Sequence, residues 1–152
     1  MTSIAIELDG VLGDTRPLWA AWLADAARVL GVDPAGLPED RGAAAAALDA
    51  AGAGNWRTLL ERFAEERAPV YLRPNAEVGS LLRRLQGAGA RLGVFTDAPE
   101  PLARVALAQL GAARRLEAVE CGEGALERLL VRLGEGATVA RTRAELAHAA
   151  KR

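Results

Sequence analysis

The sequence predicts an α/β fold in which a parallel β-sheet is flanked by helices. Short apolar runs that are typical of buried strands alternate with longer segments whose apolar residues recur at helical spacing. Strands that alternate with helices favour a parallel sheet with right-handed crossovers. A chain of 152 residues fits one domain, or one small domain with an inserted module, and is long enough to bury a core.

The first predicted strand ends in two carboxylates. An apolar run that begins at Ile4 leads to Glu7 and Asp9, and Gly10 then breaks the strand. Residues two apart on a strand point the same way, so we expect both carboxylates to face one pocket. In open α/β sheets, ligands bind at the carboxyl ends of the strands. A polar strand end without a ligand is the competing interpretation of this spacing.

A helical insertion is expected over residues 16–70, between two parts of an α/β core formed by residues 1–15 and 71–152. Its apolar residues recur at helical spacing, and Gly and Pro mark its turns. We interpret its tryptophans as packing residues between these helices rather than as ligand-stacking groups. The predicted helices are Pro17–Leu30, Arg41–Ala51 and Asn55–Arg67.

Three further strands are expected after the insertion, each separated from the next by a helix. Asn75 should cap the first of these helices, and Thr142-x-x-Glu145 has the spacing of a capping box for the last one. The predicted strands are Arg91–Phe95, Leu116–Val119 and Ala137–Ala140. The predicted helices are Asn75–Gly87, Glu100–Leu110, Gly124–Leu133 and one that starts at Thr142.

The composition argues against several classes of function. The net charge is −1, and arginines and acids are spread evenly, so we expect neither a nucleic-acid partner nor a membrane partner. No apolar run approaches the roughly 20 residues of a membrane span, and the first apolar run lacks the positive segment of a signal peptide. The single cysteine, Cys121, excludes an internal disulfide and fits the reducing cytoplasm, where we expect the protein to work. We interpret Cys121 as a structural thiol.

The stretch around the two carboxylates resembles the first motif of the haloacid dehalogenase-like (HAD) superfamily of phosphohydrolases. In that family Asp-x-Asp-Gly-x-x-x-Asp-Thr follows the first strand, the first Asp attacks the phosphoryl group and the second shuttles a proton. Here Asp9, Gly10, Asp14 and Thr15 match, but Glu7 stands at the nucleophile position. The resemblance implies a three-layer, Rossmann-like fold of the phosphatase type, in which the helical insertion is a small cap.

The second and third motifs of the family differ in how well they are kept. The stretch from Leu92 to Asp97 resembles the second motif, an apolar strand that ends in Ser or Thr. The resemblance implies that the Thr96 hydroxyl and nearby groups, those of Gly10 and Asp97, would bind the substrate phosphate. The third motif supplies a basic residue, usually lysine, but the only lysine is Lys151 in the last helix. Arg128 is a poor substitute for it.

The fourth motif normally carries the acids that hold Mg²⁺ after the fourth strand. Arg141 stands at one of these metal-ligand positions, and Glu145 is better explained as part of the helix cap. We therefore expect no metal or other cofactor, with Mg²⁺ binding absent or weak. Phosphoryl transfer depends on positioning and on charge neutralisation. Glu7 displaces its carboxylate by about one methylene, and a misplacement of about 1 Å alone can cost roughly 100-fold.

The vestigial site then consists of Glu7, Asp9, Thr96 and Arg141. We expect a degenerate member of the family that is inactive or nearly so and that binds a small phosphorylated ligand or a protein. Two alternatives remain open: an atypical phosphohydrolase that uses Glu7 and Asp9, and a purely structural or interaction protein. Phosphate binding without turnover would favour the first interpretation, turnover the second, and neither the third.

Two structural expectations follow from the family fold. The ends of the first and fourth strands are neighbours in it, so an Arg141 nitrogen should lie within about 3 Å of an oxygen of Glu7 or Asp9 and replace Mg²⁺ as the fixed cation. A solvated arginine is the competing interpretation. The last predicted strand, Ala137–Ala140, would form an exposed sheet edge, and such edges are normally covered or paired, so a homodimer is expected.

Overall fold

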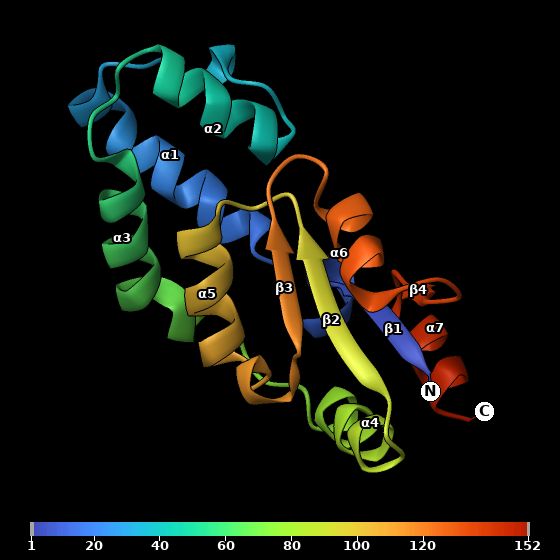
Figure 1. Cartoon of the computed structure of the whole chain (residues 1–152). Coiled ribbons are helices and arrows are strands. Elements are labelled where there is room, and N and C mark those ends of the chain that lie inside the picture. The colour runs from blue at the N-terminus through green and yellow to red at the C-terminus, as the bar shows by residue number, and fades with distance from the viewer. Residues whose placement is uncertain (1, 152) are drawn as a thin grey trace.

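The computed structural model describes residues 2–151 and contains one four-stranded parallel sheet with helices on both faces (Figure 1). This is the predicted three-layer, Rossmann-like arrangement. The strands are β1 (Ser3–Glu7), β2 (Arg91–Thr96), β3 (Ala118–Cys121) and β4 (Thr138–Ala140). The helices are α1 (Arg16–Leu30), α2 (Arg41–Ala50), α3 (Trp56–Tyr71), α4 (Ala76–Gly87), α5 (Glu100–Gln109), α6 (Ala125–Leu133) and α7 (Arg143–Ala150).

The strand order brings the sequence motifs together at the carboxyl ends of neighbouring strands. The order is β3-β2-β1-β4, and every pair is parallel. In this register Glu7 lies opposite Phe95, and Ile6 lies opposite Ala140. The carboxyl ends of β1, β2 and β4 therefore meet, and each is followed by a residue or turn that carries polar side chains.

Strand β1 separates two hydrophobic cores by its alternation. Ile4 and Ile6 are fully buried in the larger core, to which α1, α3, α4, α5 and α7 contribute. Ala5 points to the other face, into a smaller core that also contains Leu129 of α6. Both faces of β1 are buried, which fixes the position of the turn that follows it.

The helical segment, which we define as residues 16–71, contains α1, α2 and α3. Its three tryptophans are buried: the rings of Trp19 and Trp22 have centroids 5.2 Å apart, and those of Trp22 and Trp56 are 6.0 Å apart. Figure 1 shows α2 above the carboxyl ends of the strands. This placement brings the first turn of α2 to the edge where the motifs meet.

Apart from one helix end, the predicted boundaries lie within two residues of those observed. Helix α3 was expected to end at Arg67 but continues to Tyr71, through Pro69. Helix α3 packs along α5, and its buried residues continue as far as Ala68. The turn that contains Pro69 is closed by the backbone N of Leu72, a buried residue, which donates to the Ala68 carbonyl at 2.8 Å. The helix therefore continues past the proline, which a sequence pattern treats as a stop.

Strand β4 lies at one edge of the sheet and, among the described residues, pairs only with β1. It is three residues long, and short edge strands are one way in which proteins limit unwanted pairing. The homodimer expected from this edge stays a prediction. No helix within residues 2–151 has the length and apolar character needed to cross a membrane.

Candidate functional site

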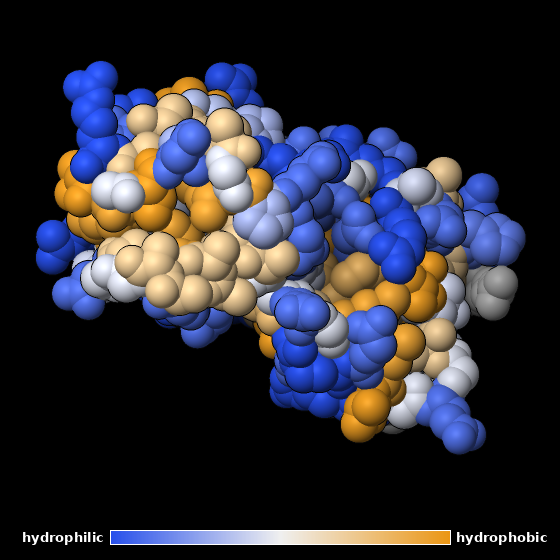
Figure 2. All heavy atoms as spheres, turned by 90° about the horizontal axis from the view of Figure 1, so that it is seen from above, coloured by the Kyte–Doolittle hydropathy of each residue, from blue (hydrophilic) through white to orange (hydrophobic). Residues whose placement is uncertain are grey.

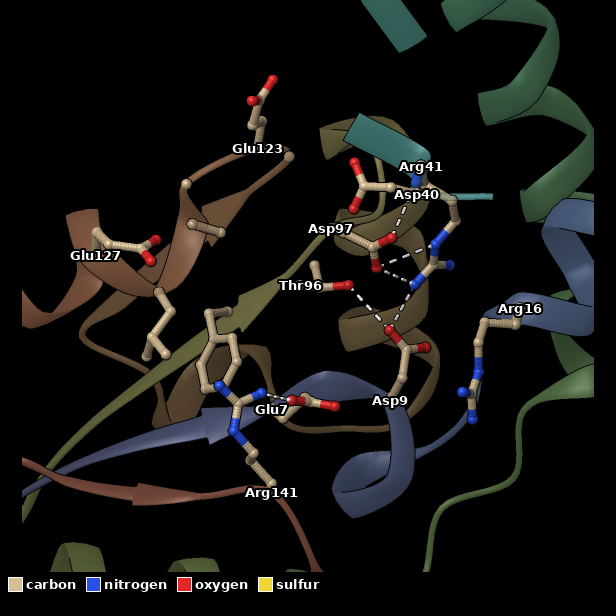
Figure 3. A pocket seen from close by; sticks show the side chains of 15 residues that line it. Glu7, Asp9, Arg16, Asp40, Arg41, Thr96, Asp97, Glu123, Glu127 and Arg141 are labelled. Carbon is tan, nitrogen blue, oxygen red and sulfur yellow. Dashed lines mark hydrogen bonds and ion pairs between the residues drawn. The ribbon is translucent and has the colours of Figure 1, made fainter. Parts of the chain in front are cut away.

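A pocket of about 360 Å³ opens between the carboxyl ends of the strands and the first turn of α2 (Figure 3). Seen from above in Figure 2, hydrophilic side chains form a band beside the more apolar surface of the helical segment. Six carboxylates and three arginines line the pocket: Glu7, Asp9, Asp40, Asp97, Glu123, Glu127, Arg16, Arg41 and Arg141. The pocket thus has an excess of three negative charges, although several of these groups are paired with one another.

Asp9 lies at the floor of this pocket with an 8% exposed side chain, and its carboxylate is fully hydrogen-bonded. Its Oδ1 accepts hydrogen bonds from the backbone N of Thr15, at 2.8 Å, and from the Thr15 hydroxyl, at 2.6 Å. Its Oδ2 accepts from the Thr96 hydroxyl, at 3.0 Å, and from Nη2 of Arg41, at 2.6 Å. A carboxylate offers about four lone-pair positions, so all of them are engaged within the protein.

Arg41 is the central cation of the site, and it was not among the site residues predicted from the sequence. It is the first residue of α2, and its side chain is 3% exposed. Its Nε and Nη2 donate to Asp97 Oδ1, at 3.2 and 2.8 Å, and its backbone N donates to Asp97 Oδ2, at 2.9 Å. Its Nη1 donates to the Thr15 hydroxyl, at 2.6 Å. One guanidinium therefore joins residues that follow β1 and β2 to the helical segment.

One sequence signal would have singled out Arg41. A positive charge in the first turn of a helix is opposed by the helix dipole. Arg41 stands at that position in an otherwise alanine-rich helix, directly after the cap residue Asp40, whose Oδ2 accepts a hydrogen bond from the backbone N of Ala43 at 2.8 Å. The ion pairs of Arg41 with Asp9 and Asp97 offset this unfavourable interaction with the helix dipole.

Arg41 and Asp97 also shift one another's ionisation. Burial alone would raise the pKa of the Asp97 carboxyl, but the hydrogen bonds and charge of Arg41 outweigh burial and lower that pKa below its ordinary value. Burial alone would lower the pKa of Arg41, yet the hydrogen bonds of Asp97 and the charges of Asp9 and Asp97 raise it. The two groups therefore stay ionised at neutral pH.

A close backbone contact positions the first turn of α2. A Cβ atom added to Gly42 would lie 2.7 Å from the backbone N of Glu123, in the loop between β3 and α6. Only glycine allows α2 to approach this loop so closely. The contact lies next to Arg41, so it helps to set the depth at which the guanidinium enters the pocket.

Arg141 forms a second, separate ion pair at the same strand ends. Its Nη1 lies 2.5 Å from Oε2 of Glu7, and its guanidinium carbon lies 5.3 Å from the ring centroid of Phe95. The predicted contact with a carboxylate is present, but it involves Glu7 alone. Arg141 has no hydrogen bond or ion pair with Asp9 among the described residues, because Arg41 holds that carboxylate instead. Figure 3 shows the two pairs side by side in one pocket.

The residue after β4 is held in place by the predicted capping box. The Glu145 backbone N donates to the Thr142 hydroxyl at 3.1 Å. The Glu145 carboxylate accepts from the backbone N of Arg141 at 2.9 Å, one residue earlier than in the usual box. Asn75 likewise caps α4 by accepting a hydrogen bond from the backbone N of Val78 at 2.9 Å.

The carboxylates at these strand ends are not arranged as ligands for Mg²⁺. This ion takes oxygen ligands in near-octahedral geometry, whereas Glu7 and Asp9 each face a guanidinium at 2.5–2.6 Å. No group of three or more His, Cys, Asp or Glu side chains within residues 2–151 is arranged to hold a metal ion. Arg141 stands where the resemblance would place a metal-binding acid.

The three residues predicted to bind substrate have different surroundings. Thr96 lines the pocket, but its hydroxyl donates to Asp9 and accepts from the backbone N of Ala98 at 3.1 Å. Asp97 also lines the pocket and holds Arg41. Gly10 is not among the lining residues; it turns the chain after Asp9, and its N–H donates to the Gly13 carbonyl at 2.8 Å. Their role in substrate binding stays a prediction.

Three other polar residues contribute little to the pocket. Arg128 donates to the Glu120 carboxylate, at 2.9 Å, and to the Cys121 carbonyl, so it is held by its own loop. Lys151 follows α7 and does not line the pocket. Burial raises the pKa of the Cys121 thiol to about 11, which leaves it protonated at neutral pH.

No protein-family model matches the sequence, and no curated protein matches it. Several solved structures do match. They include CbbY from Rhodobacter sphaeroides in complex with phosphate, with 17% identity and a TM-score of 0.64 over 87% of this chain and 72% of that one. A HAD-superfamily hydrolase of subfamily IA, variant 1, from Geobacter sulfurreducens has 19% identity and a TM-score of 0.58, over 99% and 86% of the two chains.

A HAD phosphatase from Thermococcus onnurineus is similar in size to this protein. It has 15% identity and a TM-score of 0.53, and the match covers 98% of this chain and 97% of that one. At these identities the likeness concerns the fold and not the activity. Together with the parallel sheet of order β3-β2-β1-β4, it establishes that this chain has the fold of the haloacid dehalogenase-like phosphatases.

Proposed function

We propose that this chain is a non-catalytic protein of the HAD fold, in which two internal arginines hold the carboxylates of the former active site. The observation that carries the proposal is the buried guanidinium of Arg41, which lies 2.6 Å from Asp9 and 2.8 Å from Asp97. Arg141, whose side chain is 55% exposed, holds Glu7 by one hydrogen bond from Nη1. The protein then works by binding rather than by turnover.

The hydrogen bonds of Asp9 argue against proton transfer. A residue that shuttles a proton needs a carboxylate oxygen within reach of the reacting group and free to accept from it. All four acceptor positions of Asp9 are used by Thr15, Thr96 and Arg41. Asp9 would have to break one of these buried bonds before it could take a proton from a substrate.

The charge of the pocket argues against phosphoryl transfer. This reaction is accelerated mainly by positioning and by cations that neutralise the transferred group. The pocket has three more carboxylates than arginines, and its Arg41 and Arg141 are already paired. A phosphate dianion would meet net negative charge there, and no divalent ion is available to offset it at a site whose donors do not fit Mg²⁺.

We infer that the helical segment acts as a cap that is held closed over the core. The core would consist of residues 1–15 and 71–152, and the inserted residues 16–70 would cover the carboxyl ends of the strands. Two contacts support closure: the ion pairs of Arg41 and the backbone approach of Gly42 to Glu123. A closed cap keeps large substrates away from Glu7 and Asp9.

The test is a phosphatase assay with simple phosphate esters and excess Mg²⁺, on the parent chain and on the Asp9→Asn variant. We expect no difference between the two rates, because neither chain should exceed the uncatalysed background. A magnesium-dependent rate in the parent that disappears in Asp9→Asn would support the alternative of an atypical phosphohydrolase, with Glu7 as nucleophile and Asp9 as acid and base.

A second candidate function is the binding of a small phosphorylated ligand without turnover. The side chain of Arg141 is 55% exposed, lines the pocket and uses only Nη1 for its bond to Glu7 among the described residues. Its remaining N–H groups can donate hydrogen bonds to an anion. The fold likeness to CbbY, which was solved in complex with phosphate, supports this candidate.

Calorimetric titration with inorganic phosphate tests this candidate, with Arg141→Ala as the matched variant. Saturable binding that is lost in Arg141→Ala would establish an anion site at Arg141. Binding that survives the substitution would place the phosphate elsewhere. An absence of binding heat in both chains would favour a purely structural or interaction role.

A further inference from the structure

The guanidinium of Arg41 is held in the manner of a bound ligand. A guanidinium has five N–H donors in a fixed plane, and four of them are used here. Two go to Asp97, one to Asp9 and one to the Thr15 hydroxyl. Within residues 2–151, Arg41 is the one arginine that is buried.

We propose that Asp9, Asp97 and Thr15 form a guanidinium-binding site that the chain fills with its own Arg41. The occupied site latches α2 to the sheet. When Arg41 is removed, the same site binds a small alkylguanidinium ion from solution. This inference concerns the guanidinium alone, and it holds whether or not the chain hydrolyses phosphate esters.

The arrangement of acceptors selects a guanidinium over an ammonium ion. The acceptors belong to three residues: Asp9 on the floor of the pocket and Asp97 at its rim, both labelled in Figure 3, and Thr15, whose hydroxyl accepts from Nη1 of Arg41. A planar fork reaches all three at once, whereas an ammonium ion presents its donors from a single nitrogen. The Asp97 side chain is 38% exposed and the Asp9 side chain only 8%, so a ligand from solution meets Asp97 first and Asp9 last.

The latch joins parts of the chain that are far apart in sequence. Arg41 lies 32 residues after Asp9 and 56 residues before Asp97. The backbone N of Arg41 also donates to Asp97, and the adjacent Gly42 packs on the Glu123 backbone. These backbone contacts hold the first turn of α2 at the strand ends, so that the guanidinium lies next to Asp9 and Asp97.

The guanidinium of Arg41 is part of the chain, so the site has to be tested in a variant that lacks it. A covalently attached group competes with free ligand at an effective concentration in the millimolar range or above. The parent chain should therefore bind added alkylguanidinium weakly, because Arg41 already occupies the acceptors. Removal of the Arg41 side chain exposes the same acceptors to solution.

The experiment is the titration of the Arg41→Ala variant with methylguanidinium chloride, followed by calorimetry and by thermal unfolding at constant ionic strength. Methylammonium, added as the chloride, is the comparison ion, because it has the same charge but carries all its N–H donors on one nitrogen. We expect saturable binding of methylguanidinium, about tenfold or more tighter than methylammonium, and a matching rise in the unfolding temperature. Asp97→Asn in the Arg41→Ala background should abolish the preference.

A matched control is the Arg141→Ala variant, which removes an arginine from the same pocket but leaves only one carboxylate, Glu7, without its partner. It should show no preference for methylguanidinium. Equal effects of the two cations on Arg41→Ala, or no binding to the folded variant, would overturn the proposal.

A measurement on the unmodified chain keeps the proposal testable if Arg41→Ala does not fold. Nuclear magnetic resonance of arginine Nε–H groups in the parent should show one signal with slow solvent exchange, assigned to Arg41 by its loss in Arg41→Lys. That protection should fall in Asp97→Asn, because Asp97 accepts the Nε–H bond. A parent spectrum in which all arginine Nε–H groups exchange fast would overturn the proposal.

Discussion

Replacement of Arg41 by alanine should destabilise this protein more than the loss of any exposed ion pair. Removal of one partner of a buried pair typically costs about 3–5 kcal/mol of unfolding free energy, since the other charge is left uncompensated. Here the Asp97 side chain is 38% exposed and regains water, whereas the 8% exposed Asp9 does not. We therefore expect about 3 kcal/mol, at the lower end of that range, which is a large share of the roughly 5–15 kcal/mol of a typical domain.

Urea unfolding at neutral pH measures this loss; guanidinium chloride is unsuitable, because guanidinium is the proposed ligand of the vacated site. Arg16→Ala serves as the control, since Arg16 lines the same pocket but pairs with Asp14 at the surface. Exposed pairs contribute about 1 kcal/mol or less. Addition of Asp9→Asn to Arg41→Ala should restore part of the stability, because a buried amide costs less than an unpaired carboxylate. The reasoning is refuted if Arg41→Ala costs no more than Arg16→Ala.

Three further predictions concern the same pocket. Gly42→Ala should cost about 1–3 kcal/mol in urea unfolding, as overpacking does, because the added Cβ would lie 2.7 Å from the Glu123 backbone N. The lowered pKa of Asp97 adds stability that is complete above its ordinary pKa of about 4 and is lost as pH falls through the lowered value; the parent should therefore lose more stability than Asp97→Asn between about pH 5 and pH 2. Arg141→Asp alone should gain no Mg²⁺ affinity, whereas Arg41→Ala with Arg141→Asp should show an unfolding temperature that rises with Mg²⁺.

Each of these predictions has an outcome that contradicts it. Gly79→Ala, in α4, should be neutral or stabilising, because an added Cβ would meet only the flexible Arg83 side chain, in ordinary contact at 3.6 Å. A similar loss of stability in Gly79→Ala and Gly42→Ala would contradict the steric explanation. Parallel pH profiles of the parent and Asp97→Asn would show that the Asp97 pair contributes nothing. Mg²⁺ binding by the single Arg141→Asp variant would mean that Arg41 leaves Asp9 readily.

Sequence patterns were sufficient for the fold and for half of the site. Strand and helix periods are local, so the order of elements and most boundaries could be predicted. The contact between Glu7 and Arg141 could also be predicted, because parallel neighbours place their carboxyl ends together. The end of α3 could not, because the turn that contains Pro69 is closed by a backbone hydrogen bond from Leu72, whose side chain is buried in the folded protein.

The second half of the site depends on how the helical segment lies against the sheet. Arg41 reaches Asp9 only because α2 docks at the carboxyl ends of the strands, with Gly42 on the Glu123 backbone. No periodic pattern in the sequence predicts how α2 docks on the sheet. Arg41 is the first residue of a helix that is otherwise rich in alanine. The predicted contact of Arg141 with Glu7 or Asp9 is therefore met at Glu7, whereas Arg41, the partner of Asp9, was not predicted.

The central claim is that internal arginines, and not a metal ion, neutralise the carboxylates Glu7 and Asp9. Calorimetric titration of the parent chain with Mg²⁺ at neutral pH tests it most directly, with Asp9→Asn as the companion variant. We expect no saturable binding up to millimolar Mg²⁺ in either chain, because Arg41 and Arg141 already pair with one oxygen of Asp9 and one of Glu7. Saturable one-to-one binding in the parent, lost in Asp9→Asn, would contradict it.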